Sequence, residues 1–146
     1  MSMPARACLL LATLFTFFAA NAWAGEDGLA AQDRKAIQSV IERQLAAFLI
    51  DDAETAYSFA APAIRQMFAT SDIFMSMVRR GYPQVYRSQR AQFSGLKNIQ
   101  GQPTQLVLIE GQDGSLVWAY YVMQRMDDGN WRISGCYLVK VDGQST

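Results

Sequence analysis

The spacing of apolar residues changes near the middle of the chain, and this change limits the possible folds more than any other feature. Between residues 33 and 86, apolar side chains recur every three or four positions, the spacing of helices with one buried face. Between residues 88 and 140 they alternate with polar residues or form short runs separated by turns, as in β-strands. Helices that precede an antiparallel sheet define an α+β domain, so the sequence predicts N-terminal helices packed on a sheet of about four strands.

Three helices are expected in the first half. The first begins after Asp33, whose carboxylate is expected to cap it by accepting a bond from a free backbone N–H. Its buried face is formed by Ile37, Val40, Ile41, Leu45 and Phe48. The second helix is expected to begin at Asp51, because Asp51 and Glu54 have the spacing of a capping box. Pro62 is expected to interrupt this helix. A third helix begins at Ser71.

Turn signals separate the apolar runs of the second half. In residues 104–125 the pair Asp113–Gly114 lies between two such runs, and Asp-Gly tolerates the positive φ angles of a tight hairpin turn. A second turn at 127–130 leads into a last strand, in which one face is expected to hold Trp131, Ile133, Tyr137 and Val139. Residues 88–97 are a weaker strand candidate. The sequence therefore predicts a meander of antiparallel strands.

The two central strands are apolar on both faces. Leu106 and Leu108 point to one face of their strand while Val107 and Ile109 point to the other, and residues 116–123 repeat this pattern. An antiparallel sheet with one face in water alternates apolar and polar side chains instead. We therefore expect the second face to be covered by a partner chain, by a ligand or by the curling of the sheet itself. A homodimer is the assembly that we expect.

Three segments, AYSFAAPAIRQMF, FMSMVRRGYPQVY and DGNWRISG, resemble a family of small exported bacterial proteins, the domain-of-unknown-function family with the serial number four-eight-six-four. This resemblance covers roughly residues 33–140. The order of elements and the ending DGNWRISGCYLV also resemble the nuclear-transport-factor-2-like superfamily, in which a curved sheet wraps helices into a cone. The resemblances imply a cone-like fold, but no activity, because one fold hosts many functions.

The N-terminus has the features of a signal peptide. Arg6 precedes an uncharged run at 9–20 that is too short to span a membrane, and Ala22-Trp23-Ala24 is a cleavage signature. Cleavage after Ala24 would leave no transmembrane span and a periplasmic or secreted protein. The expected division is a signal peptide (1–24), a short polar segment (25–32), a single α+β domain (33–140) and a C-terminal tail (141–146).

Composition excludes several classes of site. The chain has no histidine, which removes the commonest general base and metal ligand. Cys136 is the only cysteine after cleavage, so it has no internal disulfide partner, and a buried apolar role suits it better than a reactive one. We expect no metal and no cofactor, because zinc-ligand spacing and phosphate-binding loops are both missing. Without Arg6 the chain has 12 basic and 13 acidic residues, a balance that argues against nucleic-acid binding.

A stretch without acids carries the candidate ligand contacts. Between residues 73 and 109 there are five basic residues and no carboxylate. Arginine forks suit carboxylates, phosphates and acidic lipid head groups, and neighbouring tyrosines can form an aromatic wall. The candidates are Arg79, Arg80, Tyr82, Tyr86 and Arg87, together with Tyr57 and Trp118. A solvated face is the competing interpretation, in which these arginines pair with acids such as Asp51 and Asp52.

The function that these observations favour is non-catalytic binding of a small apolar or anionic amphiphilic ligand between the helices and the sheet. One alternative is a histidine-free isomerase or lyase, in which a carboxylate removes a proton and a tyrosine stabilises the enolate. Its candidate residues are Asp52, Asp72 and Glu110 with Tyr57, Tyr82, Tyr120 or Tyr121. Another alternative is a structural subunit of a cell-envelope complex. None of the residues is assigned a catalytic role.

Export is the first prediction. If the signal peptide is cleaved after Ala24, intact-mass analysis of the envelope fraction will find a chain that begins at Gly25. Replacing Ala22 and Ala24 by bulky residues should block cleavage and serves as the control. Full-length protein in the cytoplasm would contradict the prediction.

Overall fold

The computed structural model describes residues 28–142, and it confirms the α+β fold. The predicted signal peptide lies outside the described residues. The helices are α1 (Ala31–Leu49), α2 (Ala53–Ser58), α3 (Pro62–Met67), α4 (Ser71–Gly81) and α5 (Pro83–Tyr86). The strands are β1 (Arg90–Ile99), β2 (Gln102–Glu110), β3 (Leu116–Arg125) and β4 (Trp131–Lys140). None of the described helices combines the length and the apolar character that crossing a bilayer requires.

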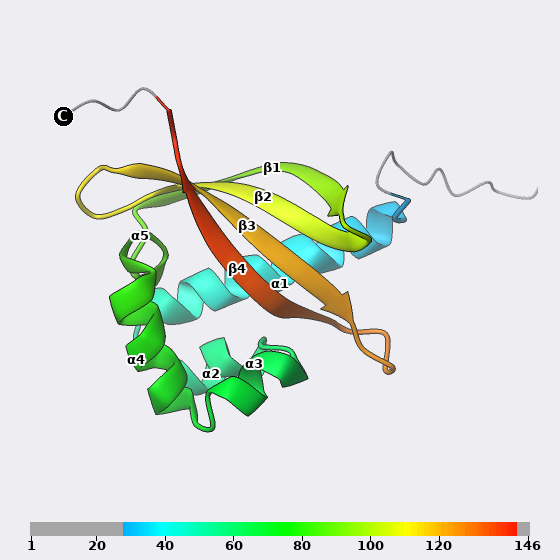
Figure 1. Ribbon diagram of the computed structural model, residues 1–146, viewed down its shortest axis with the longest axis horizontal. Coiled ribbons are helices and arrows are strands. Elements are labelled where there is room, and N and C mark those ends of the chain that lie inside the picture. Colours follow the sequence, from blue (N-terminus) through cyan, green and yellow to red (C-terminus); the bar gives the residue numbers. More distant parts are fainter. Residues whose placement is uncertain (1–27, 143–146) are drawn as a thin grey trace, which may run out of the picture.

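The four strands form one antiparallel sheet in the order β1-β2-β3-β4, and the helices lie on one side of it (Figure 1). The turns expected at Asp113–Gly114 and at 127–130 connect the last three strands, and Gly114 and Gly129 have φ angles of +78° and +84°. Such angles favour glycine, since a Cβ atom would clash with the backbone there. The weak strand candidate at 88–97 is confirmed as β1, which begins and ends two residues later than predicted.

The core lies between α1 and the inner face of the sheet. Ile37, Ile41 and Phe48 of α1 are almost completely buried, as predicted, whereas Val40 is only half-buried. The inner face contributes Val107, Ile109, Val117, Ala119, Tyr121, Met123, Trp131 and Ile133, all buried. The alternation predicted for residues 116–123 is therefore confirmed.

The two caps predicted at aspartates are wrong. Helix α1 begins at Ala31, so Asp33 lies in its first turn and accepts a hydrogen bond from Nε1 of Trp131 at 3.2 Å. Helix α2 is capped by Asp52, which accepts from the backbone N–H of Thr55 at 3.1 Å. Asp51, which was predicted to cap α2, binds Arg79 and Arg87 instead. Both predicted capping residues are therefore bound by side chains from distant segments.

A β-bulge corrects the prediction for the last strand. Consecutive β3 residues Val122 and Met123 pair with Gly135 and Ile133, so Ser134 is an extra residue in β4. Strand alternation changes phase across such a bulge. Trp131 and Ile133 therefore face the core, whereas Tyr137 and Val139, which were expected beside them, face outward with exposed fractions of 44% and 42%. 

The outer face of the sheet is apolar, as the sequence indicated. It carries Leu106, Leu108, Leu116, Trp118, Tyr120, Val122, Tyr137 and Val139, which follow from the strand register. Tyr120 and Tyr137 stack across β3 and β4 with ring centroids 4.8 Å apart. No described helix covers this face (Figure 1). We propose that a second copy of the chain covers it, because an isologous contact needs one self-complementary patch.

Light scattering tests this assembly. The protein at micromolar concentration should have twice the mass of its chain, and Tyr137→Glu should give the monomer mass, because it places a charge in the apolar contact. Leu49→Glu is the control, since Leu49 is 50% exposed on the helical side, and it should leave the dimer intact. A wild-type monomer would contradict the proposal.

Candidate functional site

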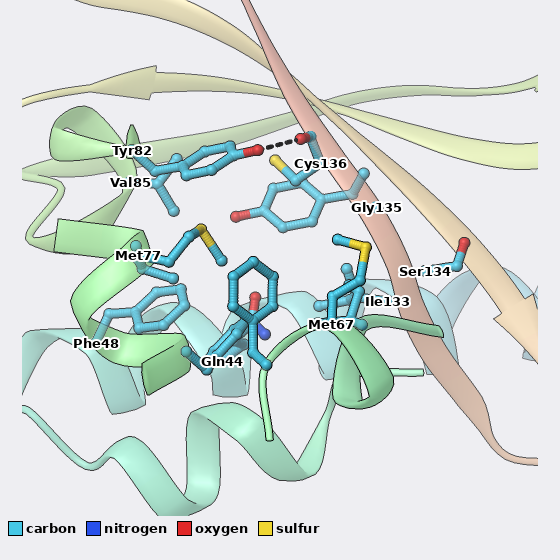
Figure 2. Close-up of a pocket in the computed structure, with 15 residues that line it drawn as sticks. Gln44, Phe48, Met67, Met77, Tyr82, Val85, Ile133, Ser134, Gly135 and Cys136 are labelled. Atoms are coloured by element: carbon cyan, nitrogen blue, oxygen red, sulfur yellow. Dashed lines mark hydrogen bonds between the residues drawn. The ribbon is translucent and has the colours of Figure 1, made fainter. Parts of the chain in front are cut away.

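An apolar cavity of about 280 Å³ lies between the helical layer and the end of the sheet formed by β3 and β4. Nearly half of its lining residues are aromatic residues or methionines, including Phe48 of α1, Met67 of α3 and Met77 of α4. Figure 2 shows the side chains of Met67 and Met77 on opposite sides of this space. The cavity is therefore lined by elements from both halves of the chain and is partly open to solvent.

Local sequence explains which side chains reach the cavity. Helix α4 presents Phe74, Met77 and Val78, whose spacing of three and four places them on one face. In β4 the four consecutive residues 133–136 all line the cavity. A regular strand would present only alternate residues on that side, so the bulge at Ser134 makes this continuous wall possible.

The hydroxyl group of Tyr121 is the unusual feature of the lining. Tyr121 is 1% exposed, and its hydroxyl is buried without a hydrogen-bond partner in the described part of the chain. Burial raises the pKa of this phenol well above its usual value, so the group is neutral at physiological pH. Buried polar groups in proteins are nearly always paired. The phenol therefore offers a donor that the described residues do not use.

Two further groups beside Tyr121 are also neutral. The Tyr82 hydroxyl donates to the backbone carbonyl of Cys136 at 2.8 Å (Figure 2), and burial raises the pKa of Tyr82. Cys136 pairs with Tyr121 across β3 and β4, and burial raises the pKa of its thiol to about 12. A thiol that stays protonated is a poor nucleophile, in keeping with the apolar role expected for Cys136.

The remaining polar side chains of the lining, Gln44 and Ser134, both donate to backbone carbonyls, Ser134 to that of Val122 at 3.1 Å. Gln44 is 4% exposed, and its Nε2 donates to the carbonyl of Ala56 at 3.1 Å, which joins α1 to α2. The lining contains no aspartate, glutamate, lysine or arginine. The site can therefore hold an apolar molecule and one neutral polar group, but it offers no charged side chain as acid, base or counter-ion.

Part of the predicted arginine cluster gathers elsewhere, around Asp51. Arg79 and Arg87 both pair with this carboxylate, Arg79 at 3.0 Å, and the Tyr86 hydroxyl also donates to it. The hydrogen bonds from Tyr86 and the two arginines lower the pKa of Asp51 to about 2. Asp51 has a φ of +56°, a left-handed conformation that aspartate tolerates better than most residues. This Asp51 cluster connects the end of α1 to α4 and α5.

The other candidates lie apart from that cluster. Of all of them, only Tyr82 lines the apolar cavity. Arg80 donates to the Ser76 carbonyl of its own helix, and the Tyr57 hydroxyl donates to the Phe68 carbonyl at 2.6 Å. Trp118 lies on the outer face of the sheet. A ligand-binding role for these residues stays a prediction, and the geometry divides them among several surfaces.

The acids considered for an isomerase also lie outside the cavity lining. Asp52 caps α2, Asp72 lies in the first turn of α4, and Glu110 faces Arg90 at 3.8 Å. Sequence reasoning missed Gln44 and Met67 as lining residues. Gln44 carried a usable signal, because it is a polar residue at the spacing of the buried stripe formed by Ile37, Ile41 and Phe48.

The fold defines a small α+β domain with an apolar cavity between its helices and its sheet. The chain matches the protein family described as "Domain of unknown function (DUF4864)" over residues 30–146. It belongs to this family, which confirms the resemblance of its motifs. No curated protein and no solved structure matches the chain, so the wider resemblance to the nuclear-transport-factor-2-like superfamily stays a prediction.

The Asp51 cluster predicts a specific pH dependence of stability. Because the folded-state pKa of Asp51 is about 2, below its usual 3.8, its ionised form stabilises the fold above pH 4, and this contribution is lost as pH falls toward 2. Asp51→Asn should therefore lower the free energy of unfolding at neutral pH, and the gap from wild type should close as pH falls through this window. Urea unfolding across this pH range measures the gap.

Arg80→Gln is the matched control for that experiment. Arg80 pairs with no carboxylate of the described chain, so its loss should change stability less than Arg79→Gln or Arg87→Gln. Asparagine retains access to the left-handed conformation of residue 51, which separates the charge effect from backbone strain. A gap that persists unchanged at low pH would contradict the assignment.

Proposed function

We propose that the protein is a non-catalytic binding domain for a small, neutral and mostly apolar molecule that carries one oxygen atom. The observation that carries this proposal is Tyr121, which lines a mostly apolar cavity and whose buried hydroxyl has no partner among the described residues. A buried donor without a partner costs about 1–3 kcal/mol. A ligand carbonyl or hydroxyl oxygen that accepts this hydrogen bond recovers much of that cost, which favours the occupied state.

The size of the cavity supports a compact ligand. Its volume of about 280 Å³ is nearly twice that of the engineered cavity, about 150 Å³, that holds benzene in another protein. A molecule of about two fused rings, or a short chain of equal volume, is therefore the size that fits.

Charge restricts the ligand further. A charged group that is buried without a partner is very unfavourable, and the lining supplies no counter-ion. Tyr82, Tyr121 and Cys136 are all neutral because burial raises their pKa values. An anionic amphiphile therefore fits only if its tail enters the cavity and its head group stays outside.

The alternatives have less support. A histidine-free isomerase or lyase needs a carboxylate in reach of the substrate, and the cavity lining has none. A purely structural subunit needs no cavity and gives no reason to keep an unpaired hydroxyl there. We also propose that the protein acts in the periplasm or outside the cell; this rests on the sequence of residues 1–24 alone.

A matched pair of probes tests the proposal. Tetralone and tetralin have the same two-ring frame, but only tetralone carries a carbonyl oxygen. Wild-type protein should bind tetralone more tightly than tetralin, with a dissociation constant up to about tenfold lower. This is the gain in affinity expected from one added hydrogen bond. Tyr121→Phe should remove this preference while tetralin still binds, and titration followed by NMR measures both affinities.

Tyr137→Phe is the control, because it removes an equivalent hydroxyl from the outer face of the sheet. It should leave both affinities unchanged. Tyr121→Phe should also fold at least as stably as wild type, since it deletes an unpaired polar atom. Failure of both probes to bind, or equal affinity of wild type for the two, would overturn the proposal.

A further inference from the structure

The rim of the cavity carries large apolar side chains that are exposed. Met67, at the end of α3, lines the cavity and is 70% exposed. Ile73, in the first turn of α4, is 51% exposed and lies one turn from the lining residue Met77. Exposed apolar groups that gather in this way at a binding site indicate an interaction surface rather than isolated surface residues.

Helix α3 is a projecting part of this rim. None of its residues is buried, and it is held through polar contacts. Arg65 donates to the carbonyls of Ser58 at 2.9 Å and Ala60 at 3.1 Å, and Tyr57 donates to that of Phe68. Met67 therefore projects from a helix that these polar contacts hold in place and that meets the core only through the partly buried Ile64.

Positive charge accompanies the apolar rim. Residues 62–89, which include α3, α4 and α5, contain four arginines and one acid. On α4, Ile73, Met77 and Arg80 follow one another at spacings of four and three, so they share one face of the helix. Arg80 pairs with no carboxylate of the described residues. The negative charge of Asp51 balances only one of the two positive charges of Arg79 and Arg87, so a positive charge remains there.

We propose that this rim, formed by Met67, Ile73 and Arg80, docks on the surface of an anionic lipid bilayer, from which the cavity takes up its ligand. The ligand-uptake part rests on the function proposed above. A mostly apolar ligand partitions into bilayers, so a binding protein with its entrance on the bilayer meets it where it is concentrated. Apolar side chains enter the boundary of the acyl chains, while arginine binds lipid phosphates through its planar fork.

A second copy of the chain fits this surface less well. In a two-fold contact the same patch faces its own copy, so a patch with an excess of arginines brings like charges together, which opposes association. The outer face of the sheet carries apolar residues without this concentration of arginines, and it is the surface that suits self-association.

Vesicle flotation tests the proposal. The purified protein should float with vesicles of phosphatidylcholine mixed with phosphatidylglycerol, and not with phosphatidylcholine alone. Binding should fall as salt rises, because the attraction is screened over a Debye length of about 8 Å at physiological ionic strength. Ile73→Ser/Arg80→Gln should reduce vesicle binding by about tenfold or more, the scale of burying one large apolar side chain.

Leu49→Ser/Lys35→Gln is the matched control, since it also removes one exposed apolar group and one base, but from α1, outside both the rim and the outer face of the sheet. It should bind vesicles as wild type does. Absence of binding to the mixed vesicles, equal binding to both lipid compositions, or an equal loss in both variants would overturn the proposal.

The same variants separate this proposal from the proposed function. Ile73 and Arg80 do not line the cavity, so Ile73→Ser/Arg80→Gln should bind tetralone in solution as wild type does. Tyr121→Phe should lose its preference for tetralone and still float with anionic vesicles. A loss of vesicle binding in Tyr121→Phe would contradict the assignment of docking to the rim.

Discussion

The backbone of Ile133 is the connection on which the arrangement of helices and sheet depends. Its N–H donates to the carbonyl of Phe59 at 2.8 Å, and its carbonyl accepts from the N–H of Ala61 at 2.8 Å. These two bonds place the link between α2 and α3 alongside the open edge of β4. They also fix where the helical layer meets the sheet, and therefore where the cavity lies. Because Ile133 adjoins the bulge at Ser134, the irregular strand and the position of α3 are parts of one arrangement.

The class and order of the elements could be predicted from the sequence, because periodicity reports burial directly. Helix α1, the hairpin turn at Asp113–Gly114 and the two apolar faces of β3 all followed from spacing. The predictions that were wrong concerned single side chains and the number of helices, since the described residues form five helices where three were expected. Asp33 and Asp51 satisfied local capping rules, but Trp131 in one case and Arg79 with Arg87 in the other supplied partners that no local rule contains. The bulge was missed because one extra residue leaves each half of β4 with a normal alternation.

The candidate site was harder to predict than the fold. A cavity is space that side chains leave unfilled. Neither composition nor the spacing of apolar residues shows which side chains do not contact one another in the folded protein. The arginines were conspicuous because they are charged and close together, yet Arg79 and Arg87 bind an acid from the end of α1. Tyr121 was considered only as one apolar residue of its strand and as one of four tyrosines that could stabilise an enolate. Its importance comes from the missing partner of its hydroxyl, a property of the three-dimensional arrangement alone.

The bulge also changes what a loss of chain length would do to the protein. A strand that loses one residue usually turns its later side chains to the opposite face. Ser134 of β4 is an exception to this rule. It is the extra residue of the bulge and has no partner residue in β3, so its loss would leave the other pairs in register. A chain without Ser134 would keep Ile133 and Cys136 on the inner face, opposite Met123 and Tyr121 as they are now. Deletion at this position would therefore remove one side chain from the cavity lining and straighten β4, while the other lining residues of the strand kept their faces.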